Sequence, residues 1–168
     1  MKQMIAQDIT QGKGVCVVDP HGDLAEYALS VVPPERANDV VYFNPGDTDM
    51  PLGLNMLEID PSRPEQKTFV ANEMLAIVKS LYKDVPEAFG PMFEQYFKNA
   101  VLLLLDDYAA QVPTLAEIPR VLADAVYRKD KLSRETNPLV KNFWEEEAAK
   151  AGGEGALENM VPYITSKL

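Results

Sequence analysis

In the first third of the chain, segments whose apolar residues have helical spacing alternate with short continuous apolar runs. Residues 15–18, Val-Cys-Val-Val, form a continuous β-favouring run, which is typical of a strand covered on both faces in a parallel sheet. Residues 39–43 predict a second strand, and residues 1–10 and 24–32 predict a helix before each strand. The order helix, strand, helix, strand indicates a doubly wound α/β fold with few strands.

The pattern changes after an irregular connector at residues 51–61, and helical spacing dominates from there onwards. Prolines suited to a first helical turn and one capping box mark where these helices begin. The first predicted helix occupies residues 64–83 and the last occupies residues 156–168. Between them, three helices are predicted to start at Pro91, at Thr114 with its capping partner Glu117, and at Asn137-Pro138. We therefore predict two regions, a partial α/β nucleotide-binding core in residues 1–60 and an all-helical domain in residues 61–168.

One segment of the helical region also resembles a catalytic strand. Residues 101–107, Val-Leu-Leu-Leu-Leu-Asp-Asp, have the apolar run and terminal acids of a Walker B motif. However, Phe93, Phe97, Val101 and Leu105 keep helical spacing, and leucine favours helix over strand. We predict a helix here.

The composition and charge of the chain argue against several classes of function. The chain carries 26 acidic and 16 basic side chains in 168 residues, a net charge of −10, so it does not attract phosphate backbones by itself. Cys16 is the only cysteine, which excludes a disulfide within the chain, and its apolar surroundings predict a buried thiol. The longest apolar stretch, residues 100–105, is too short to span a bilayer.

The polar loop after the first predicted strand is the leading candidate site. Asp19, His21 and Asp23 follow residues 15–18 directly, at the edge where open α/β sheets bind ligands. These side chains could coordinate a metal through water or orient a nucleophilic water. In the other interpretation, Asp19 and Asp23 cap the turn and the following helix and His21 is exposed.

The same loop resembles the first motif of metallophosphoesterases. In that motif an Asp and a His, here Asp19 and His21, bind one metal of a two-metal site. Further histidine ligands are needed, and His21 is the only histidine in the sequence. This alternative is therefore weak.

A phosphate-binding loop of the form G-x-x-x-x-G-K-[ST] does not occur in the sequence. Residues 12–14, Gly-Lys-Gly, lack the hydroxyl residue and the spacing, and they follow a predicted helix where the motif would precede one. We interpret them as a turn that ends the helix.

Several stretches, in order, resemble one family. GVCVVDPHGDL at residues 14–24 looks like the second strand of conjugative coupling proteins and HerA/FtsK-like motor ATPases of the P-loop superfamily. Residues 33–58, PPERANDVVYFNPGDTDMPLGLNMLE, are similar to that family's next strand, Asp-rich turn and connector. The helical region, with FEQYFKNAVLLLL, PTLAEIPRVLAD, NPLVKNFW and VPYITSKL, looks like the all-α insertion of type IV secretion and conjugative DNA-transfer proteins.

This resemblance implies a partial RecA-like core and an ATP-driven DNA- or protein-translocating motor, with ATP and Mg²⁺ bound by the parent protein. It places Asp19, His21 and Asp23 beside the nucleotide γ-phosphate or at a subunit junction, with a catalytic, water-positioning or sensing role. It also implies that Gly22 and Asn55 contact the nucleotide. We expect this chain to begin inside the helix that follows the Walker A loop and to stop before the Walker B strand, and so not to hydrolyse ATP by itself.

The resemblance also implies partners and a location. Other copies of the parent would form a ring hexamer, and DNA, relaxosome proteins or secretion proteins would be its substrates. The expected location is the cytoplasm, with the parent at the inner membrane. A different class of function stays open, in which the helices form a non-catalytic module that binds a relaxosome or secretion partner.

Overall fold

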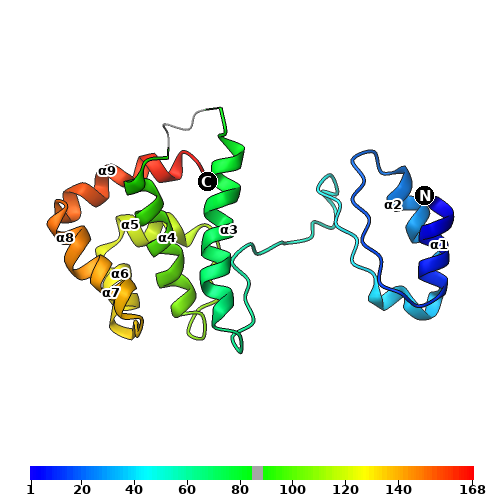
Figure 1. The fold of residues 1–168 in the computed structure, drawn as a ribbon, viewed down its shortest axis with the longest axis horizontal. Coiled ribbons are helices and arrows are strands. Elements are labelled where there is room, and N and C mark those ends of the chain that lie inside the picture. The colour runs from blue at the N-terminus through cyan, green and yellow to red at the C-terminus, as the bar shows by residue number, and fades with distance from the viewer. Residues whose placement is uncertain (85–88) are drawn as a thin grey trace. The chain divides into compact units, whose positions relative to one another are not determined.

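The computed structural model describes residues 1–84 and 89–168, apart from the side chain of Glu154. The described residues fall into two compact units, Met1–Gly53 and Leu54–Leu168, here called the first and second units. Figure 1 shows helices in both units and no strand in the part of the chain that is described. The expected α/β fold with a partial parallel sheet is therefore wrong.

The first unit contains two short helices and one 3₁₀ segment. These are α1 (Lys2–Thr10), α2 (Asp23–Ser30) and η1 (Pro34–Asp39). The two predicted helices are thus present, and α1 packs against α2. Ile5 and Ile9 of α1 are buried as their spacing predicts, but Met4, expected on the same side, is 68% exposed.

The two expected strands are irregular chain. Residues 15–18 lie between α1 and α2, and residues 40–43 follow η1, which already includes Asp39. No backbone hydrogen bond joins the two segments among the described residues. The β preference of valine reflects a fit to a pleated, half-buried surface, so it produces a strand only where neighbouring chain supplies that surface. Cys16, expected to be buried, is exposed for the same reason.

The second unit is a helical bundle with one connected core. Its elements are α3 (Glu65–Leu81), α4 (Pro91–Asp106), α5 (Glu117–Ala123), α6 (Ala125–Arg134), α7 (Pro138–Asn142), the π-helical segment η3 (Phe143–Glu147), α8 (Ala148–Lys150) and α9 (Gly153–Thr165). In Figure 1, α4 lies between α3 on one side and α6 and α7 on the other, and it also contacts α5 and α9.

The central position of α4 follows from its sequence. Its apolar side chains surround most of the helix, so it can be covered from several sides at once. Phe97, Val101 and Leu104 are fully buried. The prediction that residues 101–105 are helical is confirmed.

Local signals set several helix starts in this unit. Pro91 and Pro138 occupy the first positions of α4 and α7, as predicted. The Glu117 carboxylate accepts hydrogen bonds from the Thr114 N–H at 2.6 Å and the Thr114 hydroxyl at 2.8 Å, which is one half of the predicted capping box. The other half is absent, because the Thr114 hydroxyl accepts the N–H of Ala116 at 3.3 Å and not that of Glu117. The regular helix α5 begins at Glu117, three residues later than predicted.

Among the described residues, no helix has both the length and the apolar character needed to cross a membrane.

Candidate functional site

The loop at residues 19–23 is held together by the Asp19 carboxylate. Asp19 Oδ1 accepts the backbone N–H of His21 at 3.1 Å. Asp19 Oδ2 accepts the N–H groups of Leu24 at 2.7 Å and Ala25 at 3.2 Å, which are first-turn donors of α2. A helix leaves these donors without intrahelical partners, so Asp19 caps α2 from a distance along the chain.

The same contacts set the charge of Asp19. The N–H groups of His21 and Leu24 hold the pKa of the Asp19 carboxyl below its usual value, while partial burial opposes them. Asp19 is therefore a carboxylate whose two oxygens are both used by backbone donors. This geometry matches the capping interpretation of the loop.

His21 and Asp23 do not converge with Asp19 on a ligand. Both side chains are exposed, and neither has a hydrogen-bond partner in the described part of the chain. Asp23 is the first residue of α2, where a negative charge is favourable beside the helix N-terminus. Across residues 1–84 and 89–168, no group of three or more His, Cys, Asp or Glu side chains is placed to hold a metal ion.

Gly22 and Asn55 have structural roles in separate units. Gly22 sits at the N-cap of α2 with φ of 93°, in the left-handed region where any side chain would be strained. In the second unit, Asn55 Nδ2 donates to the Pro113 carbonyl at 2.9 Å, and Asn55 Oδ1 accepts the Leu57 N–H at 3.0 Å. Asn55 thus fastens the chain before the buried Leu57 to the segment that leads into α5.

A hollow of about 740 Å³ lies beside Asp19 in the first unit. Its wall is largely apolar, and the charged groups on it are the carboxyls of Asp19 and Asp39. The other residues that line it are Val15, Cys16, Val17, Val18, Pro20, Ala25, Val41, Tyr42, Phe43 and Pro45. Because this lining has carboxylates and no lysine or arginine, it does not favour a phosphate group.

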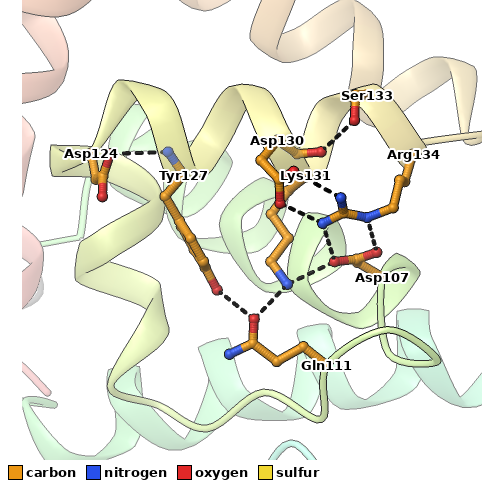
Figure 2. A network of polar contacts seen from close by, with 8 residues as sticks. All are labelled: Asp107, Gln111, Asp124, Tyr127, Asp130, Lys131, Ser133 and Arg134. Atoms are coloured by element: carbon orange, nitrogen blue, oxygen red, sulfur yellow. Dashed lines mark hydrogen bonds and ion pairs between the residues drawn. The ribbon is translucent and has the colours of Figure 1, made fainter.

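The most elaborate polar cluster lies in the second unit, around Asp107 (Figure 2). Asp107 is 7% exposed, and Lys131 Nζ donates to its Oδ2 at 2.7 Å. Arg134 forms a two-pronged contact, from Nε to Oδ1 at 2.8 Å and from Nη2 to Oδ2 at 3.0 Å. Gln111 Oε1 accepts from Lys131 Nζ at 2.9 Å and from the Tyr127 hydroxyl at 3.4 Å.

Contacts within the cluster stabilise the ionised forms of Asp107 and Arg134. Hydrogen bonds from Arg134 and Lys131 hold the pKa of Asp107 below its usual value against the opposing effect of burial. Asp107 and Asp130 in turn raise the pKa of Arg134. A group that stays ionised at all ordinary pH values does not exchange protons in catalysis, so we interpret the cluster as structural.

Sequence reasoning missed this cluster. In the sequence, Asp107 stands out only as the end of a run that resembles a Walker B motif. A signal was present, because Lys131 and Arg134 are three residues apart and therefore project from one face of α6. What the sequence does not show is that this face meets the end of α4.

Comparison with protein-family models, curated proteins and solved structures found no match to this chain.

Proposed function

We propose that the chain works as a non-catalytic binding module in which the helical second unit recognises a partner protein. The observation that carries this proposal is the outer side of α3. This helix packs mainly against α4, and it leaves Phe69 62%, Leu81 71% and Ile77 37% exposed. At about 100° per residue, the three side chains fall within about 120° of the helix circumference.

The chemistry of this surface favours a protein partner over nucleic acid. Exposed aromatic and aliphatic side chains on a helix are typical anchors for a groove or helix on another protein. The net charge of −10 repels phosphate backbones and favours a partner with basic groups around its contact surface. The sequence resemblance supports a relaxosome or secretion protein as that partner.

The experiment measures binding of the whole chain to purified relaxosome and secretion proteins of conjugative transfer systems, and it compares substitutions on α3 with a control. Phe69→Asp and Leu81→Asp should each weaken binding at least about tenfold, the effect of losing one good anchor. Leu139→Asp is the matched control, because Leu139 is 79% exposed on α7, away from α3. Absence of binding to all these proteins, or equal losses in the control, would contradict the proposal.

A second candidate function is a place within an ATP-driven motor of conjugative DNA transfer or type IV secretion. The observation that favours it is the ordered series of stretches, from residues 14–24 to the end of the chain, that resemble this family. The chain alone should not hydrolyse ATP with Mg²⁺. Hydrolysis that Asp19→Ala abolishes would contradict this expectation.

The same candidate can be tested in a complete motor. Asp19→Ala or Asp23→Ala should lower ATP hydrolysis more than nucleotide affinity, because a water-positioning group acts mainly in the transition state. Equal losses in hydrolysis and affinity would contradict a water-positioning role for this loop.

A further inference from the structure

A buried carboxyl group, that of Glu135, and a partly buried one, that of Asp106, lie between the end of α4 and the turn from α6 into α7. Asp106 is the last residue of α4, and Glu135 follows α6 and is 8% exposed. One oxygen of each, Asp106 Oδ2 and Glu135 Oε2, is buried and has no hydrogen-bond donor among the described residues. A buried acceptor without a donor costs free energy, so the arrangement requires an explanation.

The other oxygens of the two groups are occupied. Lys67 Nζ, from α3, donates to Asp106 Oδ1 at 2.8 Å. The Asn137 N–H donates to Glu135 Oε1 at 2.6 Å. The nearby cations Lys131 and Arg134 are bonded to Asp107. In the described part of the chain, Lys67 thus supplies a positive charge to this pair, at the Asp106 carboxylate.

The Asp106 side chain is close enough to that of Glu135 to act on it both through its charge and through a hydrogen bond. Burial raises the pKa of Glu135 most strongly, and the negative charge of Asp106 and a hydrogen bond with its side chain raise it further. The N–H groups of Asn137 and Thr136 oppose this shift. Two ionised carboxylates cannot form a hydrogen bond, whereas a carboxyl and a carboxylate that share one proton can.

We propose that Asp106 and Glu135 share one proton in the folded chain, and that the pair is a pH-sensitive latch between the end of α4 and the turn into α7. The proton resides on Glu135, because burial favours its neutral carboxyl, while Asp106 accepts the hydrogen bond from Lys67 Nζ. This proposal is independent of the partner-binding function.

The direction of the pH effect follows from linkage. Glu135 has a folded-state pKa above its ordinary value of 4.5, so its stabilising contribution is fully present below about that pH. The contribution is lost as the pH rises through the folded-state pKa. The latch is closed in mild acid and opens toward alkaline pH.

Urea unfolding of the whole chain at several pH values from about 4 to 8 tests the latch. Glu135→Gln keeps an oxygen for the Asn137 N–H and supplies an N–H for Asp106, so it mimics the closed latch at every pH. At pH 8 this variant should unfold with an equilibrium constant about tenfold smaller than that of the wild type, the effect of keeping one hydrogen bond to a charged group. The difference should shrink toward pH 4.

Glu158→Gln is the matched control, because Glu158 is exposed on α9 and its replacement also removes one negative charge. Its unfolding should follow the wild-type pH profile. A Glu135→Gln variant no more stable than the wild type at pH 8, or a Glu158→Gln profile that matches that of Glu135→Gln, would overturn the proposal.

Two further measurements keep the proposal testable if the variant does not fold. In the wild type, the side-chain carboxyl carbon of Glu135 should titrate by NMR above pH 4.5, and titration at or below this value would overturn it. MgCl₂ or CaCl₂ should leave the wild-type unfolding midpoint at pH 8 unchanged apart from a general salt effect shared with Glu158→Gln. Stabilisation that exceeds this shared effect would show that a cation joins the pair in place of the proton.

Discussion

The two units place the same residue types in opposite surroundings. In the first unit, Val18 is 88% and Val41 81% exposed, whereas Val101 and Val121 of the second unit are fully buried. Ile5 and Ile9 are the buried apolar side chains among the described residues of the first unit. The other described buried apolar residues all belong to the core of the second unit.

This difference teaches that burial depends on what packs around a residue more than on its own preference. Valine in α4 is buried because α4 has neighbours on several sides. The valines of residues 15–18 and 40–43 have the pattern of a covered strand but no paired neighbour in the described structure. Stability should therefore come almost entirely from the second unit.

The largest expected effect comes from creating a cavity in the core of the second unit. Phe97→Ala removes a fully buried ring stacked on Phe93 and should lower the free energy of unfolding by about 3–5 kcal/mol. Urea unfolding followed by the fluorescence of Trp144, the single tryptophan, measures it. The counterpart in the first unit, Phe43→Ala, removes a ring that is 51% exposed and should leave this transition nearly unchanged. Similar losses from both substitutions would remove the contrast between the units.

A somewhat smaller effect should follow from breaking the Asp107 cluster. Asp107→Ala leaves the ammonium group of Lys131, whose side chain is 2% exposed, buried without its carboxylate. We expect a loss of about 3 kcal/mol, because Arg134 is partly exposed and can turn toward water. Asp130→Ala removes the exposed partner of Arg134 and should shift the same Trp144 transition only slightly. An equal loss of stability from the two substitutions would show that burial of the ion pair does not determine its contribution to stability.

The same cluster predicts loss of stability in acid. Because the folded-state pKa of Asp107 lies below its ordinary value of 3.8, its contribution is present above that pH and is lost as the pH falls through the folded-state pKa. The Trp144 transition should weaken below about pH 3.8 in the wild type, and this component should be absent in Asp107→Asn. A wild-type profile as flat as that of the variant would contradict this assignment.

The smallest effect is local to the first unit. Asp19→Ala removes the acceptor for the Leu24 and Ala25 N–H groups, so amide hydrogen exchange at these two positions should become faster while α4 is unaffected. Asp23→Asn is the control, because its side chain is exposed and does not hold these amides. Unchanged exchange in Asp19→Ala would show that the carboxylate does not cap α2.

Sequence patterns predicted the helices better than the expected strands because helix signals are local. Pro91, Pro138 and the contact between Thr114 and Glu117 act within one turn, so the chain itself contains the necessary information. A strand depends on a partner elsewhere in the chain, and the apolar run at residues 15–18 does not specify one. The prediction of a sheet was wrong because the sequence does not specify which segments pair.

In the candidate site, too, contacts between residues close in sequence could be predicted and contacts between distant residues could not. The cap that Asp19 provides to α2 joins residues five and six positions apart, and it was among the two interpretations of the loop. The contacts of Asn55 with Pro113 and of Asp107 with Arg134 join residues 58 and 27 positions apart. Such contacts depend on the packing of whole helices, and the spacing of residues along the chain does not reveal them.

Amide hydrogen exchange of the whole chain tests the central claim most directly. If residues 15–18 and 40–43 are unpaired, their amides should exchange rapidly, while those of residues 97–105 in α4 should exchange at rates close to the limit set by global unfolding of the second unit. Slow exchange at residues 15–18 and 40–43, comparable to that in α4, would show a paired sheet in the first unit and would contradict the all-helical fold.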